Sequence, residues 1–168
     1  RYSLINPKKY IDVNIYGLLT ATNIIANFMI KQGFGKIFNM EGFGSDGRIM
    51  DKLTLYGTTK RAVNYFSKSI SREIENTNFQ IGILSPGMVR TDFLDYSMQN
   101  QSPEELKKFK KVYEVLAEDV DVVAKFLVNG ILNSKKNYDK IKFLSGSKLM
   151  FEILKLMFKW KNYLFIYS

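Results

Sequence analysis

The sequence predicts an α/β fold built around a parallel sheet. Three short apolar runs of strand length each end in a glycine-containing or polar loop. Longer runs before and between them repeat apolar residues at helical spacing, and this alternation of elements is typical of helices packed on a parallel sheet. The three strand-like runs are residues 36–40, 78–85 and 141–144.

The composition is that of an ordinary globular protein and excludes two kinds of site. Of the 168 residues, 46% are hydrophobic and 24% are charged, which suits one domain or a part of one. The chain has no cysteine, so it holds neither a disulfide framework nor a thiolate zinc site. It has no histidine either, so acid–base chemistry falls to Tyr, Lys, Asp or Glu.

The net charge of +9 raises the alternative of nucleic-acid binding. Arginine is the residue expected for bidentate contacts with phosphates and bases, and it occurs only at positions 1, 48, 61, 72 and 90. We therefore expect no nucleic-acid partner. No apolar run is expected to reach the roughly 20 residues of a membrane-spanning helix, which predicts a soluble or membrane-peripheral protein.

Residues 8–32 are predicted to form a long helix that is apolar on most sides and therefore buried, between the sheet and a partner subunit. Gly33 follows the last periodic residue and ends it. Asn14 lies within this helix, where a satisfied buried polar group is the simplest interpretation.

A second long helix is predicted over residues 53–75, and its start carries Tyr56 and Lys60. Residues four apart share one face of a helix. A tyrosine hydroxyl has a pKa near ~10, which a nearby ammonium and the positive end of a helix dipole would lower. The pair therefore predicts a general acid or base, although many helices carry this spacing by chance.

Two loops follow strand ends, where ligands of open parallel sheets bind. Asn39 lies near the carboxyl end of the first strand, before the glycine-rich loop of residues 41–51. Pro86 and Gly87 turn the chain sharply after the second strand, for steric reasons that need no function.

Taken together, these segments resemble the short-chain dehydrogenase/reductase family. The resemblance is carried by Tyr56-Gly-Thr-Thr-Lys60, by Ser85-Pro-Gly-Met-Val-Arg-Thr91 and by Asn14, and with Phe38–Gly47 it is strongest to chlorophyll(ide) b reductases. It implies the C-terminal part of a doubly wound Rossmann-like parallel sheet whose first half is missing. The family's Thr-Gly-x-x-x-Gly-x-Gly turn is not found in residues 1–168, so the isolated chain is expected to bind cofactor poorly and to be inactive.

The resemblance also implies an activity, namely hydride transfer between NAD or NADP and a carbonyl or alcohol. Tyr56 would exchange the proton, Lys60 would lower the tyrosine pKa and bind the nicotinamide ribose, and Asn14 would hold a proton-relay water. The implied cofactor-binding residues are Tyr56, Lys60, Asn39, Pro86, Gly87, Met88, Val89 and Thr91.

Position 42 departs from the family pattern. Most members carry there a serine that hydrogen-bonds the substrate carbonyl, whereas this chain has Gly42. The nearest hydroxyl is Ser45, which either polarises the carbonyl or is simply a turn serine.

The remaining segments predict a variable substrate lid at about 88–116, a helix at 119–134, and an amphipathic C-terminal helix at about 147–160. The last either covers the sheet or a neighbouring subunit, or rests on a membrane surface.

The breadth of the apolar faces of helices 8–32 and 53–75 predicts a homo-oligomer. The 13 Phe, 10 Tyr and 7 Met residues hint at an apolar small-molecule substrate. A non-catalytic remnant or interaction module that keeps the oligomerisation helices remains the alternative to an enzyme.

Overall fold

A computed structural model describes residues 6–75, 77–91, 102–146 and 150. The chain forms two compact units, which we describe separately. The first contains the residues up to Ser85 and residues 127–141, and the second contains residues 86–126 and those from Lys142 onward.

A parallel sheet forms the centre of the first unit. Strand β1 (Gly35–Met40) pairs in parallel with β2 (Phe79–Ser85), and β5 (Lys140–Lys142) completes the strand order β1-β2-β5. Because the two long strands are parallel and in register from Gly35–Phe79 to Met40–Leu84, their carboxyl ends meet at one edge. The predicted α/β fold with a parallel sheet is confirmed.

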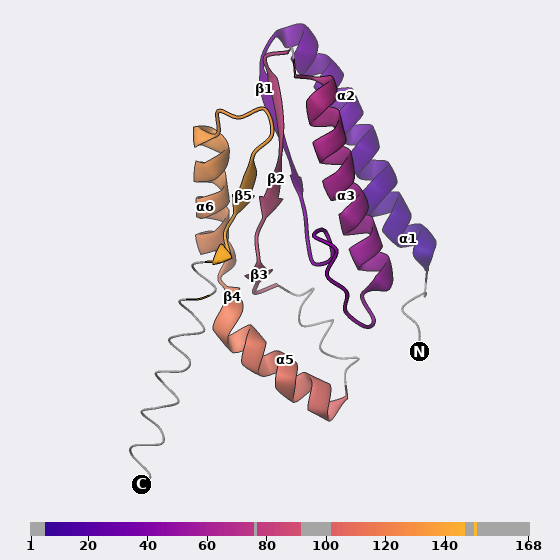
Figure 1. Cartoon of the computed structure of the whole chain (residues 1–168), viewed down its shortest axis with the longest axis vertical. Helices are drawn as coiled ribbons and strands as arrows, with labels where there is room; N and C mark the ends of the chain where they lie inside the picture. Colours follow the sequence, from indigo (N-terminus) through magenta and orange to yellow (C-terminus); the bar gives the residue numbers. More distant parts are fainter. Residues whose placement is uncertain (1–5, 76, 92–101, 147–149, 151–168) are drawn as a thin grey trace. The chain divides into compact units, whose positions relative to one another are not determined.

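Helices flank this sheet on two sides. Figure 1 shows α2 and α3 along β1 and β2, where α2 contacts β1 and α3 contacts β2. Residues 127–133 of α6 lie beside β5, and Gly130 packs against Ile141. Ala26 of α2 and Ile74 pack with Phe79 and Ile81 of β2 in a buried apolar cluster. The helices are α1 (Pro7–Ile11), η1 (Asp12–Gly17), α2 (Leu18–Gln32), α3 (Thr54–Glu73) and α6 (Val120–Asn133). The predicted helices at 53–75 and 119–134 thus match α3 and α6.

The first predicted helix is interrupted. Its α-helical parts, α1 and α2, are separated by the π-helical segment η1, which contains Asn14. A Cβ added at Gly17 would lie 3.2 Å from the carbonyl oxygen of Asp12, so a glycine eases the packing of this widened turn. The predicted stop is confirmed, because Gly33 has a left-handed backbone and donates to the carbonyl oxygens of Met29 and Ile30.

The sequence did not indicate a segment of membrane-spanning length, and the structure contains one candidate by length and composition alone. Residues Pro7–Gln32 form one helical stretch of 26 residues, and an 18-residue window within it has a mean hydropathy of 1.4, so the stretch is long and apolar enough to cross a membrane. Of that window 11% is buried, and the stretch is the one such segment among the described residues. Length and composition are weak evidence, since helices of soluble proteins meet the same criteria. Here α2 packs on β1 and β2.

The second unit contains two short paired strands and a helix. Strand β3 (Met88–Val89) pairs in parallel with β4 (Ala117–Glu118), and α5 (Pro103–Leu116) leads into β4. The helix begins at Pro103, directly after Ser102, which is a residue pair typical of a helix start. The sequence did not indicate β3 and β4. Residues 92–101 of the predicted lid and nearly all of the predicted C-terminal helix at 147–160 lie outside the described residues.

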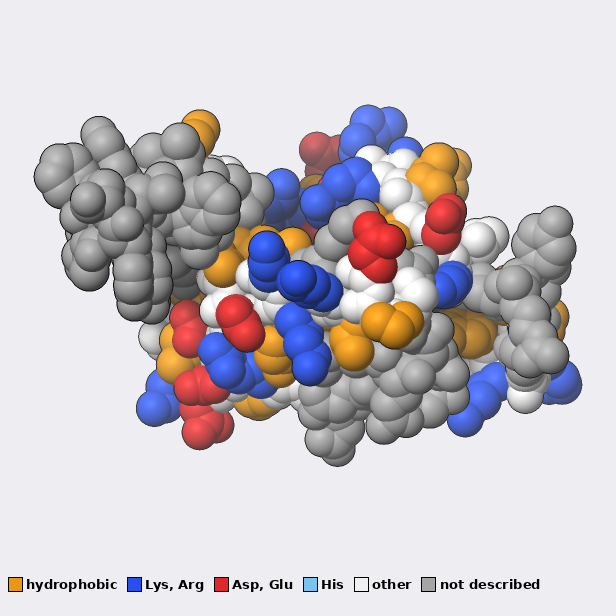
Figure 2. Space-filling view, turned by 90° about the horizontal axis from the view of Figure 1, so that it is seen from below, with side chains coloured by type: hydrophobic (Ala, Val, Ile, Leu, Met, Phe, Trp, Pro, Cys, Tyr) orange, Lys and Arg blue, Asp and Glu red, His pale blue; other side chains and the backbone are white. Residues whose placement is uncertain are grey.

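Charges of both signs share the described surface with exposed apolar side chains. On the face drawn in Figure 2, Lys and Arg side chains are interspersed with Asp and Glu, and hydrophobic side chains lie between them. The excess of lysine in the composition therefore does not form one uniform basic surface on this face.

Candidate active site

Tyr56 and Lys60 lie at the start of α3, on the face that meets the end of β1. The Nζ of Lys60 is 5.8 Å from the centroid of the Tyr56 ring. The same nitrogen donates a hydrogen bond of 3.1 Å to the carbonyl oxygen of Met40, the last residue of β1. The first turns of α3 are therefore anchored at the carboxyl end of the strand, where ligands of such sheets bind.

The hydroxyl of Tyr56 lies directly against Gly42. A Cβ built on Gly42 would lie only 2.2 Å from the Tyr56 hydroxyl oxygen, far inside the contact distance of two atoms. Any side chain at position 42 would therefore displace the phenol. This explains in packing terms why the residue expected to be serine is glycine, since the phenol occupies the space of its Cβ.

A second glycine contact holds the same loop on α3. Gly44 has a left-handed backbone with φ of 91°, and a Cβ added there would lie 2.6 Å from the Cα of Gly57. The backbone of the loop thus packs directly on the backbone of the helix, one residue after Tyr56.

Burial shifts the pKa values of both groups in the direction that favours their neutral forms. Burial raises the pKa of the Tyr56 hydroxyl, and the nearby Tyr10 adds to this. Burial also lowers the pKa of the Lys60 ammonium. The sequence-based expectation that the pKa of Tyr56 is lowered is therefore not met in this chain, because both burial and Tyr10 raise it.

Asn14 is joined to the turn of α3 that carries the pair. Its Nδ2 donates a hydrogen bond of 3.0 Å to the hydroxyl of Thr59, which is 2% exposed. That hydroxyl in turn donates to the carbonyl oxygen of Tyr56, at 2.8 Å. The structure thus brings Asn14 to Thr59, the residue next to Lys60, while the predicted relay water stays a prediction.

Asn39 faces the interior. Its Nδ2 donates to the hydroxyl of Ser67 at 2.9 Å, and its Oδ1 accepts from the hydroxyl of Thr22 at 3.4 Å. The side chain is buried and joins β1 to α2 and α3. Any contact of Asn39 with a cofactor would therefore have to use its backbone.

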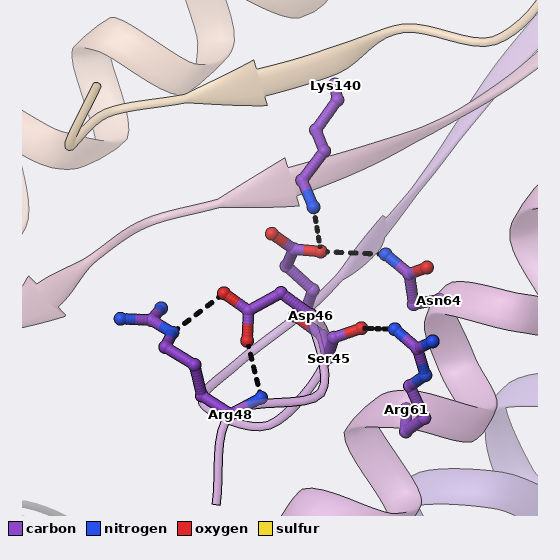
Figure 3. Close-up of polar contacts among 7 residues, drawn as sticks. Ser45, Asp46, Arg48, Arg61, Asn64 and Lys140 are labelled. Carbon is purple, nitrogen blue, oxygen red and sulfur yellow. Dashed lines mark hydrogen bonds and ion pairs between the residues drawn. The ribbon is translucent and has the colours of Figure 1, made fainter. Parts of the chain in front are cut away.

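Ser45 is held in the turn after β1. It is 3% exposed, its backbone N–H donates to the Gly42 carbonyl, and its own carbonyl accepts from Nη1 of Arg61 at 2.8 Å. Figure 3 shows this contact beside the Asp46–Arg48 pair of the same loop. Since both hydrogen bonds use backbone atoms of a buried residue, they favour the turn-serine interpretation over the polarising one.

The turn after β2 belongs to the second unit. Gly87 has a left-handed backbone with φ of 75°, as a Pro-Gly turn requires, and Met88 and Val89 form β3. The Thr91 hydroxyl donates to the carbonyl oxygen of Val89 at 3.5 Å. The cofactor contacts predicted for Pro86 to Thr91 stay predictions.

Sequence reasoning missed Glu41, the first residue after β1. Its side chain is buried, and its Oε2 accepts from the Lys140 Nζ at 2.7 Å and from the Asn64 Nδ2 at 3.0 Å (Figure 3). A carboxylate between a strand end and two glycines was its only sequence signal. Among the described residues, no cluster of three His, Cys, Asp or Glu side chains could hold a metal ion.

Two proteins named chlorophyll(ide) b reductase are similar in sequence to this chain. The chain is 38% identical over 146 residues to chlorophyll(ide) b reductase NOL of Oryza sativa subsp. japonica, covering 82% of this chain and 41% of the relative. It is 37% identical to the protein of that name from Arabidopsis thaliana, over 82% of this chain and 40% of the relative. The chain thus spans about two-fifths of the length of these relatives.

Solved structures and a family model complete the comparison. Levodione reductase superposes with a TM-score of 0.70 at 18% identity, over 87% of this chain and 59% of that one. The KRED1-Pglu enzyme superposes with a TM-score of 0.64 at 22% identity, over 79% and 58%. These likenesses show the fold. The family model described as short chain dehydrogenase matches residues 3–102. With relatives of the chlorophyll(ide) b reductase type, that match confirms the predicted family, and the chain belongs to the short-chain dehydrogenases.

Proposed function

We propose that this chain carries the proton-transfer half of an NAD(P)-dependent oxidoreductase that interconverts a carbonyl and an alcohol. The observation that supports this most directly is the position of the Tyr56 hydroxyl. It lies against Gly42 at the carboxyl end of β1, with Lys60 one helical turn away. Membership of an oxidoreductase family is consistent with this reaction.

The protonation state of Tyr56 suits the reductive direction. Because burial raises the pKa of its hydroxyl, the phenol is protonated at neutral pH. A protonated phenol donates a proton to a carbonyl oxygen as that oxygen gains negative charge. Lys60 lies close enough to stabilise the phenolate that remains.

The residues of the pair also suit a nicotinamide dinucleotide. When bound, this cofactor supplies or accepts the hydride. The Lys60 ammonium and the Tyr56 hydroxyl offer hydrogen-bonding groups on one face of α3, which fits the hydroxyls of a ribose. Asn14, joined to Thr59 on the next turn, would hold the water that returns a proton to the lysine. Pro86, Gly87 and Thr91 would line the nicotinamide.

For the substrate we propose chlorophyll(ide) b or a related large apolar carbonyl compound. The support is the identity of 37–38% to reductases of that name. The cofactor, NAD or NADP, and the carbonyl-polarising group are left open.

The experiment is a hydroxyl deletion in the full-length protein. Tyr56→Phe should lower kcat for chlorophyllide b reduction by about 10²- to 10⁴-fold, the range of general acid catalysis, while the protein remains folded. Tyr65→Phe is the matched control, since Tyr65 lies on the same helix and is 75% exposed. A Tyr56→Phe enzyme with kcat close to that of the parent would contradict the proposal.

We further propose that α2 and α3 pair with their copies in a second subunit. A groove of about 330 Å³ lies between them, lined by Ile15, Leu19, Phe66 and Ile70 among others. Phe28 of α2 is 68% exposed. Phe28→Glu should shift the full-length protein from dimer or higher oligomer to monomer in light scattering. An unchanged mass would argue against this interface.

A further inference from the structure

Glu41 is a carboxylate held inside the protein at the end of β1. It is 5% exposed, and its Oε2 accepts two hydrogen bonds, from Lys140 on β5 and from Asn64 on α3. Its backbone N–H donates to the carbonyl of Leu84 on β2 at 2.9 Å. One residue thus joins the end of β1 to three other elements, as Figure 3 shows for the two side-chain contacts.

The ion pair itself gives little reason for such burial. Taking the Glu41 carboxylate and part of the Lys140 ammonium out of water offsets much of their attraction, so apolar residues of the same size would stabilise the fold about as well. The charged pair instead fixes the position of the Glu41 side chain, because one carboxylate oxygen accepts from both Lys140 and Asn64. Its charge also reaches Tyr138, whose pKa is raised by burial and, second, by Glu41.

The residue after Glu41 is the one on which the Tyr56 hydroxyl lies. There is no space for even a methyl group between Gly42 and the phenol, so a small shift of the backbone at position 42 moves the hydroxyl as well. The far side of the loop is held by Arg61 on the Ser45 carbonyl and by the Gly44–Gly57 contact. Glu41 is the anchor on the near side.

We infer that Glu41 is a positioning residue for Tyr56. Held by Lys140 and Asn64, its carboxylate sets the position of Gly42, and Gly42 sets the position of the phenol. This inference rests on the proposed role of Tyr56 as the proton donor. In this inference Glu41 acts through Gly42 and does not act on the substrate.

The test follows the Tyr56 phenol directly by ¹³Cζ-tyrosine NMR across a pH titration of the full-length protein. The Tyr56 signal is identified by its loss in Tyr56→Phe. Among the described titratable groups, Tyr10 on α1 raises the pKa of the phenol and the Lys60 ammonium on α3 lies over its ring. Glu41→Ala should admit water at Gly42, so the Tyr56 midpoint should fall toward its ordinary value. In the same variant kcat should fall about tenfold to a hundredfold, as expected for a misplaced catalytic group, with KM changed less than about twofold.

Two further variants make the result specific. Glu41→Gln keeps an oxygen that accepts from Lys140 and Asn64, so it should restore most of the kcat and of the Tyr56 midpoint. Arg48→Gln breaks the exposed ion pair with Asp46 in the same loop and should change neither. If Glu41→Ala does not fold, Asn64→Ala is the variant to measure. It removes one of the two hydrogen bonds to the Glu41 carboxylate, so the Tyr56 titration midpoint should fall by a smaller amount.

The inference would be overturned if Glu41→Ala folded and kept the Tyr56 midpoint and the kcat of the parent. If Glu41→Ala does not fold, the same result for Asn64→Ala would overturn it. Its failure is distinguishable from failure of the proposed function. An active Tyr56→Phe enzyme would refute the proton-donor role, whereas the NMR signal of Tyr56 reports its position whether or not it takes part in the reaction.

Discussion

The loops that follow β1 and β2 are held in two different ways. After β1, a buried carboxylate, a glycine–glycine backbone contact and a carbonyl–arginine hydrogen bond fix the chain on α3 and β5. After β2, the chain forms the two-residue strand β3, and Arg90 makes an ion pair with Asp119 at 3.4 Å and lies over the Tyr113 ring. The side chains of Arg90 and Asp119 are 50% and 73% exposed.

This difference indicates which loop is preorganised. The first loop carries Gly42 under the Tyr56 hydroxyl. It is held by buried contacts whose hydrogen-bonding groups are paired. Exposed ion pairs contribute little because water competes for both charges. The first loop therefore has the rigidity that a proton donor needs, and the second is expected to tolerate change.

The largest expected effect is on the first loop. Lys140→Met leaves the Glu41 carboxylate buried with only Asn64 as a partner among the described side chains, and should lower the free energy of unfolding by about 3–5 kcal/mol. Urea unfolding of the full-length protein measures this. The double variant Glu41→Gln/Lys140→Met removes the stranded charge and should recover most of the loss. A single variant as stable as the parent would mean that the carboxylate is not isolated from water.

A pair of glycine substitutions gives the next largest difference. Gly44→Ala combines a left-handed backbone with a Cβ that meets the Gly57 backbone at 2.6 Å, so it should lower the free energy of unfolding by about 3 kcal/mol. Gly87→Ala is the control in the second loop. It has the same backbone strain, but its Cβ meets the Leu144 side chain at 3.0 Å, which predicts about 1–2 kcal/mol. Equal losses in thermal or urea unfolding would remove the contrast between the two loops.

The smallest effect is expected at the ion pair of the second loop. Asp119→Asn removes the negative partner of Arg90 and should change the free energy of unfolding by less than about 1 kcal/mol, since both side chains are half exposed or more. The urea midpoint is again the measurement. A loss comparable to that of Lys140→Met would show that burial does not distinguish the two loops.

Much of the fold followed from local patterns. The apolar stripe of α3, the glycine that ends α2 and the strand lengths of β1 and β2 are set by neighbours along the chain, and all were predicted within a few residues. The π-helical segment around Asn14 was not, because an apolar repeat does not distinguish a π turn from an α turn. Nor did the sequence reading single out the helical stretch Pro7–Gln32 as a candidate of membrane-spanning length, because polar residues interrupt its apolar run.

For the candidate site, helical pitch was enough to predict that Tyr56 and Lys60 share a face, because it brings residues four apart together. The packing of distant segments was needed to show that the phenol lies on Gly42, that Asn39 faces the interior and that Glu41 is buried on Lys140. It also decided that the pKa of Tyr56 is raised and not lowered. The physical reason is that burial and long-range hydrogen bonds depend on segments far apart in the chain, whose approach no local spacing records.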